Sequence, residues 1–110
     1  MNADEMADEW VRLRRSVLPE EHQRAAWMEM PDEAWAAVLE RHPDMANWVA
    51  HAKRSPRDIV ARLARHPDWR VRAAVAAQRR LDPAIRAELA QDPHEIVRRR
   101  AGRFLEVDGL

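Results

Sequence analysis

Residues 56–102 contain almost the same pattern twice, and this duplication limits the possible folds more than any other feature of the chain. In each copy a proline opens a helix, and an Ile and a Leu follow four residues apart. A second proline comes four residues after the Leu, and a Val-Arg pair then lies early in a second helix. The corresponding residues are Pro56, Ile59, Leu63, Pro67, Val71 and Arg72, then Pro83, Ile85, Leu89, Pro93, Val97 and Arg98. The pattern predicts a repeat of two short helices.

A weaker copy precedes these two. Pro31 opens a predicted helix in which Trp35 and Leu39 lie four residues apart, and Pro43 follows four residues later. The closing prolines of the three copies, Pro43, Pro67 and Pro93, are almost evenly spaced. Proline both ends the first helix and presets φ for the first turn of the next, so this spacing marks helix boundaries. No arginine of this copy corresponds to Arg72 and Arg98.

The first thirty residues lack the repeat but still predict helix. Met6, Trp10, Leu13 and Val17 follow one helical stripe, which indicates a helix over residues 4–17. A second helix is expected to start at Pro19 and to stop before Pro31. We expect this segment to be an atypical helix pair that caps one end of the repeats.

The second helix of each later pair has a predicted inward stripe. The residues of these stripes are Met45, Trp48, Val49 and Ala52, then Val71, Ala74, Val75 and Gln78, then Val97, Ala101 and Phe104. These stripes would pack against neighbouring pairs, because a pair of about 25 residues cannot bury its apolar face alone.

The predicted fold class is therefore all-α, a short α-solenoid of about four stacked helix pairs in a single domain, 1–110. Only two glycines and 35% charged residues agree with helix nearly everywhere, and no alternating β-branched run predicts a strand. The predicted parts are the cap, residues 1–30, and repeat units at residues 31–55, 56–82 and 83–105.

The segments HPDWRVRAAVA and DPHEIVRRRAG resemble the leucine-rich repeat variant family and, more broadly, short HEAT-type (HEAT-like) helical repeats. The likeness is good over residues 56–102, fair over residues 31–53 and absent over the first thirty. It implies a right-handed stack of helix pairs that serves mostly as an interaction surface. The iron–sulfur cluster of the founding family member needs cysteine, which this chain lacks. A HEAT-like branch of DNA glycosylases holds DNA on a basic concave face, but its catalytic residues have no counterparts here.

Charge is divided unevenly along the chain although the net charge is zero. Residues 1–50 hold five Arg against eleven Asp and Glu, a balance of −6, and residues 51–110 hold fourteen Lys and Arg against eight, a balance of +6. This asymmetry indicates an anionic partner at one end or head-to-tail association into a homo-oligomer. The alternative is an ordinary solvated helical surface.

The candidate partner-binding residues lie on or just after the predicted second helices. They are Trp69, Arg72, Arg79, Arg80, Arg98, Arg99, Arg100 and Arg103. Stacking would align Arg72 with Arg98 as steps of a basic ladder that suits an acidic protein surface or a phosphate backbone. The alternative for these two arginines is an internal pair with the aspartates of the turns, Asp68 and Asp92.

Trp69 has two interpretations as well. An exposed Trp beside arginines would be an anchor for a protein partner or a stacking platform for a base. The alternative is packing into the groove of the preceding unit.

Nothing in the sequence predicts a catalytic, cofactor or metal site. His42 and His66 occupy the same place before a proline, but no His-x-x-x-His or Glu-x-x-His spacing exists, so polar turn residues are the better interpretation. A glycine-rich phosphate loop and a Ser/His/Asp set are also lacking. We therefore expect no enzyme and no cofactor.

The predicted function is a non-enzymatic protein–protein interaction module, an adaptor or an inhibitor or immunity protein of the small bacterial type. Its binding surface would be the groove lined by the second helices, and its partner would have an acidic surface. The alternative is binding of a nucleic-acid backbone through the C-terminal arginines. The acidic start and the shortness of every uncharged run favour a cytoplasmic protein without a membrane segment.

Overall fold

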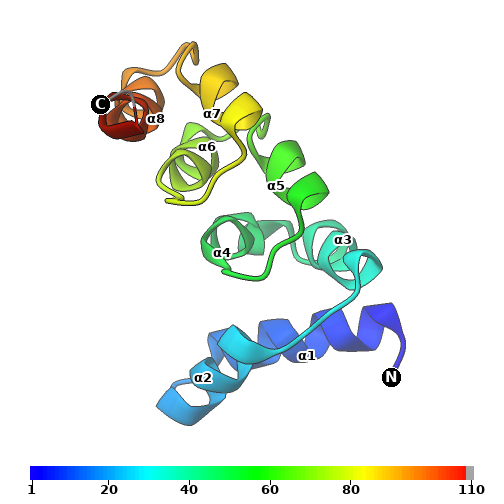
Figure 1. Ribbon diagram of the computed structural model, residues 1–110. Coiled ribbons are helices and arrows are strands. Elements are labelled where there is room, and N and C mark those ends of the chain that lie inside the picture. The colour runs from blue at the N-terminus through cyan, green and yellow to red at the C-terminus, as the bar shows by residue number, and fades with distance from the viewer. Residues whose placement is uncertain (109–110) are drawn as a thin grey trace. The chain divides into compact units, whose positions relative to one another are not determined.

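The computed structural model describes the main chain of residues 1–108 and the side chains of residues 1–103 (Figure 1). The described chain is helical throughout its regular structure and contains no strand, which confirms the prediction of an all-α protein. The elements are α1 (Ala3–Arg15), α2 (Pro19–Trp27), α3 (Asp32–Arg41), the 3₁₀ helix η1 (Pro43–Met45), α4 (Ala46–His51), α5 (Arg57–Leu63), α6 (Trp69–Ala76), α7 (Pro83–Leu89) and α8 (Glu95–Asp108).

Short polar side chains and prolines determine where the helices begin. The side chain of Asn2 accepts a hydrogen bond from the N–H of Glu5 at 2.8 Å and caps α1. Asp68 and Asp82 cap α6 and α7 in the same way. Pro19 is the first residue of α2, where its missing N–H costs nothing. The helix starts are therefore local properties of the sequence.

Residues Met1–Ile59 form one compact unit, the first unit. Within it α1 packs against α2 and α3, and α3 packs against η1 and α4 (Figure 1). The rings of Trp10 and Trp35 meet edge to face in its core, with their centroids 5.3 Å apart. Such a pair adds about 0.5–1.5 kcal/mol beyond the burial of its area.

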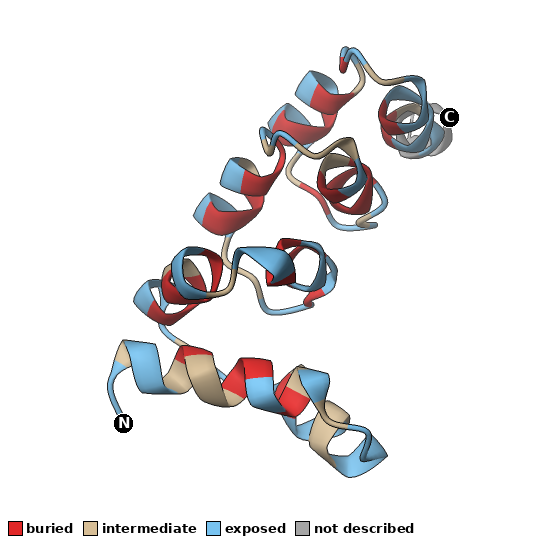
Figure 2. Ribbon diagram, turned by 180° about the vertical axis from the view of Figure 1, so that it is seen from behind, coloured by how far each residue is buried: buried red, intermediate tan, exposed pale blue. Residues whose placement is uncertain are grey.

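Residues Val60–Leu110 form the second compact unit, which the structure describes to residue 108. Its helices α6, α7 and α8 pack against one another. Leu63 and Leu89 are each 1% exposed, and the predicted inward residues Val71 and Val97 are buried as well. Buried positions form a stripe along each of these helices (Figure 2), as the spacing of the aliphatic residues predicts.

The helix bounds of the second half repeat with the period that separates Pro67 from Pro93. Adding one period to the bounds of α5, residues 57 and 63, gives the bounds of α7, residues 83 and 89. The same step takes Trp69, the first residue of α6, onto Glu95, the first residue of α8. The sequence period is thus also a period of local structure.

Two residues predicted to point inward are exposed, and those predictions are wrong. Val17 is 92% exposed because α1 ends at Arg15 and Ser16 is extended, so helical spacing does not continue to Val17. Trp48 is 45% exposed. The predicted helix over residues 44–53 is divided into η1 and α4, where Ala46 and Ala50 are buried together with the other predicted stripe residues, Met45, Val49 and Ala52. The side chain of Phe104 lies outside the described residues.

Candidate functional site

The turns before α6 and α8 share one hydrogen-bonding arrangement with its two side chains exchanged. In the first turn His66 Nδ1 and Asp68 each accept a hydrogen bond from the main-chain N–H two residues further on, at 3.0 and 2.9 Å. In the second turn Asp92 and His94 Nδ1 do the same, at 2.8 and 3.2 Å. The sequences His-Pro-Asp in one copy and Asp-Pro-His in the other therefore form turns with the same hydrogen bonds.

Arg72 and Arg98 fasten these turns to the helices that follow them. Nη1 of each arginine donates to the carbonyl oxygens six and five residues before it, at 2.7 and 3.1 Å for Arg72 and at 2.8 and 2.9 Å for Arg98. A hydrogen bond from a charged donor is stronger than a neutral one, so these contacts stabilise the turns. Both arginines therefore have a structural role.

Arg72 also forms a buried ion pair within the second unit. Its Nε lies 2.8 Å from Asp92 Oδ2, and the two side chains are 15% and 6% exposed. Burial raises the pKa of Asp92, but the hydrogen bonds from Arg72 and from the N–H of His94 outweigh it, so the pKa lies below its ordinary value. Of the two turn aspartates, Asp92 is thus the partner of Arg72, whereas Asp68 pairs with Arg70 at 3.0 Å.

Trp69 stands at the start of α6 and is half-buried. Its ring stacks on the imidazole of His94, with centroids 4.0 Å apart and planes at 10°. The stacking partner belongs to the turn before α8, which follows Trp69 in the chain. One face of the indole is therefore occupied inside the protein.

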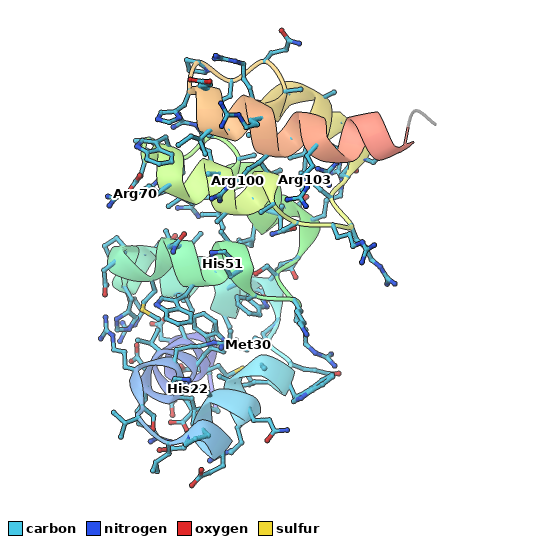
Figure 3. All side chains as sticks on the ribbon, turned by 90° about the vertical axis from the view of Figure 1, so that its left-hand side faces the viewer. His22, Met30, His51, Arg70, Arg100 and Arg103 are labelled. Carbon is cyan, nitrogen blue, oxygen red and sulfur yellow. The ribbon has the colours of Figure 1, made fainter. Side chains whose placement is uncertain are left out.

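The remaining candidate arginines are exposed. Arg79, Arg80, Arg100 and Arg103 form no ion pair with any described side chain, whereas Arg99 pairs with Glu95 at 2.7 Å. Figure 3 shows α6 and α8 lying side by side, with Arg70 at the start of α6 and Arg100 and Arg103 along α8. We call Arg79, Arg80, Arg100 and Arg103 the basic surface of the second unit.

The repeat period relates the members of the basic surface. Arg103 of α8 corresponds to Ala77, which follows α6 directly and precedes Arg79 by two residues. α6 and α8 run in the same direction (Figure 3), so the C-terminal end of α6 lies level with this part of α8. The members of the basic surface thus belong to two neighbouring helices of the second unit and to the turn that follows one of them.

Sequence reasoning missed Arg86, which is 3% exposed. Its guanidinium donates to the carbonyl oxygens of Ala76 and Gln78 at the end of α6, the first at 3.3 Å. Arg86 occupies the position in its repeat that the buried Val60 occupies in the preceding one. A charged residue at this apolar position is the feature of the sequence that could have indicated a buried arginine. Its hydrogen bonds satisfy carbonyl groups that a helix end leaves without partners.

The two compact units carry opposite charges. Residues 1–59 hold eight Lys and Arg against twelve Asp and Glu, a balance of −4, and residues 60–110 hold eleven against seven, a balance of +4. The basic surface therefore lies on a unit that attracts anions as a whole.

An open hollow in the first unit gathers Asp8, Ser16, Glu21 and His42 among its lining residues. His42 Nε2 lies 2.8 Å from Asp8, and hydrogen bonds from Arg41 and His42 lower the pKa of Asp8 to about 2. Ser16 Oγ donates to Glu21 at 2.8 Å and not to His42, so the three residue types of a serine hydrolase are present without the required geometry.

Among the described residues, no three His, Cys, Asp or Glu side chains are grouped so that they could hold a metal ion. His66 and His94 accept main-chain hydrogen bonds, and His42 contacts Asp8, so these histidines have structural partners. Of the described helices, none has the length and apolar character needed to cross a membrane.

Comparison with known proteins adds no relative. No protein-family model matches the chain. No curated protein is significantly similar to it in sequence. No solved structure matches it significantly either.

Proposed function

We propose that the chain is a non-enzymatic protein-interaction module built from short helical repeats, and that its basic surface binds an acidic surface of a protein partner. The observation that carries the proposal is the set of four exposed arginines, Arg79, Arg80, Arg100 and Arg103, that have no ion pair among the described side chains. Arginine is enriched at protein interfaces because its planar guanidinium binds carboxylates with two hydrogen bonds.

The repeat part of the proposal is supported by the local structure of the second half. Helix bounds, turn hydrogen bonds and the contacts of Arg72 and Arg98 all recur with the same period. A right-handed solenoid is an arrangement in which such pairs cover one another's apolar faces. Solenoids of this kind usually supply surfaces for partners and no catalytic centre.

Contacts inside the protein leave fewer candidates for binding. Arg72 binds main-chain carbonyls through Nη1 and Asp92 through Nε and Nη2, so its guanidinium has little capacity left for a partner. Arg98 is exposed and binds main-chain carbonyls through Nη1. Trp69 is half-buried and stacks one face of its ring on His94, so that face is closed to a partner. The basic surface is the better contact region.

A nucleic-acid backbone is the second candidate ligand, because the same four arginines and the +4 balance of the second unit suit phosphates. The two ligands differ in their response to salt. For a nucleic-acid backbone, the logarithm of the association constant should fall linearly with the logarithm of the salt concentration. The slope is set by the number of phosphates that the protein neutralises. Labelled DNA and RNA oligonucleotides that do not bind at low salt would exclude this candidate.

The test of the protein-binding proposal is charge reversal with a matched control. Arg100→Glu with Arg103→Glu should abolish capture of partners from the native source, because like charges would then face an acidic surface. Arg24→Glu with Arg62→Glu changes the net charge equally at exposed positions elsewhere and should leave capture intact. Capture that is identical for both double variants would refute the assignment of the basic surface.

A further inference from the structure

The first unit carries two exposed tryptophans that each lie beside an arginine, far in sequence from the basic surface. Trp27 at the end of α2 is 64% exposed, and Trp48 of α4 is 45% exposed. Figure 3 shows Met30 between α2 and α4, the helices that carry these two residues. We call Arg14, Trp27, Met30, Trp48 and Arg54 the tryptophan face.

Each exposed indole is held by an arginine from another element. The guanidinium of Arg54, in the turn after α4, lies 5.5 Å from the ring centroid of Trp27, and that of Arg14 in α1 lies 5.7 Å from that of Trp48. Cation–π contacts of this kind favour one orientation of the rings. Two exposed, oriented tryptophans are expensive to keep in water and are the residues that most often anchor a protein partner.

Arg14 is the least satisfied cation of this face. It lies between Trp48 and the buried Trp10, 5.4 Å from the second ring, and its Nε is buried without a hydrogen-bond partner among the described residues. No described carboxylate pairs with it, and burial lowers the pKa of its guanidinium. A half-buried cation without a counter-ion gains more from an incoming carboxylate than an exposed one, because the surrounding dielectric is lower.

Arg54, unlike Arg14, already has a carboxylate partner. It pairs with Glu29 at 3.0 Å, but the Glu29 side chain is 83% exposed and contributes little to binding the arginine. A carboxylate of a partner could replace Glu29 at small cost. The two arginines therefore offer two anion positions, each beside an exposed indole.

We propose that the tryptophan face binds a protein segment that places a carboxylate against Arg14 and apolar side chains against Trp27 and Trp48. The proposal concerns a different surface from the basic surface and does not depend on it. The charge of the first unit favours a short segment of protein over a nucleic acid. A balance of −4 repels a continuous phosphate backbone, whereas one or two carboxylates beside apolar groups meet two local cations.

The test is selection of random short peptides displayed on phage against the full chain. The selected peptides should contain Asp or Glu beside aromatic or aliphatic residues. Binding of a fluorescein-labelled selected peptide should fall at least about tenfold with Arg14→Met, which keeps the apolar stem but removes the charge. The same loss is expected when Glu in the peptide is replaced by Gln, or when Trp27 is replaced by Ala. Trp27 is so exposed that this last change should leave the fold intact.

Matched controls separate the tryptophan face from the basic surface and from a general loss of folding. Arg24→Gln, which changes an exposed arginine of α2, should leave peptide binding unchanged, and so should Arg100→Glu with Arg103→Glu. Selection of peptides without carboxylates, or binding unaffected by Arg14→Met and Trp27→Ala, would overturn the proposal. A wild-type dimer that these same two variants dissociate would show that the occupant is a second copy, and the proposal would then be wrong.

Discussion

Arg72 and Asp92 stand 20 residues apart and form two hydrogen bonds, at 2.8 and 3.3 Å. Arg72 belongs to α6, whereas Asp92 lies in the turn that leads to α8, so the pair joins one helix pair to the next. Asp92 also caps the turn by accepting a hydrogen bond from the N–H of His94. One carboxylate therefore has two structural contacts, and we expect the second unit to depend on it more than on an exposed ion pair.

The first prediction concerns the strength of this pair. Arg72→Met and Asp92→Asn should each lower the free energy of unfolding by about 2–4 kcal/mol, because each leaves a buried group without its partner. A double-mutant cycle measured by urea unfolding should give a coupling of about 1–3 kcal/mol. Arg99→Gln removes an exposed pair with Glu95 and should cost less than about 0.5 kcal/mol. Equal losses for Arg72→Met and Arg99→Gln would contradict the structural role of Arg72.

The second prediction concerns acid. The folded pKa of Asp92 lies below its ordinary value of 3.8, so the unfolded chain binds this proton more readily than the folded chain does. The stabilisation is fully present above about pH 4 and is lost as the pH falls through the folded pKa. Unfolding followed from neutral to strongly acidic pH should show a smaller loss of stability for Asp92→Asn than for the wild type. Parallel curves would mean that Asp92 does not titrate differently in the two states.

The third prediction concerns the aliphatic core. Leu63→Ala and Leu89→Ala should each cost about 2–5 kcal/mol, since both side chains are 1% exposed and their removal leaves cavities. Val17→Ala is the control, because Val17 is exposed despite its place in the apolar stripe, and it should change stability by less than about 0.5 kcal/mol. Losses below about 1 kcal/mol for both leucines would place them outside the core.

The fourth prediction concerns the buried arginine. Arg86→Ala should cost about 2–4 kcal/mol, because the carbonyls of Ala76 and Gln78 lose a charged donor in a buried setting. Hydrogen exchange should show the extra opening at the end of α6. Arg62→Ala, which removes an exposed arginine of α5, is the control and should leave exchange at α6 unchanged. Unchanged exchange in Arg86→Ala would show that the helix end does not need this side chain.

Much of the local structure follows from the sequence. Pro19 and Pro83 begin helices as predicted, and Pro31, expected to begin one, is the residue just before α3. The burial of Ile59 and Ile85 follows from their spacing to the leucines. Helix starts and apolar stripes are predictable because caps, proline and side-chain periodicity act over only a few residues.

Trp48 marks the limit of this predictability. Its place in the stripe assumed a regular helix from residue 44, but the chain makes a 3₁₀ turn first, and of the four stripe residues Trp48 alone is exposed. η1 packs against α3, and the linear pattern does not record that packing.

The sequence by itself determined an all-helical chain, helix starts at its prolines or within two residues after them, and the leucines that fill its core. Only the tertiary structure decided which arginines have partners within the protein. Arg72 pairs with Asp92 and not with Asp68, Arg86 is buried, and Arg14 lies between two tryptophans without a described carboxylate. The reason is physical: local conformation depends on neighbouring residues, whereas ion pairing depends on distances between side chains that the folded backbone alone brings together.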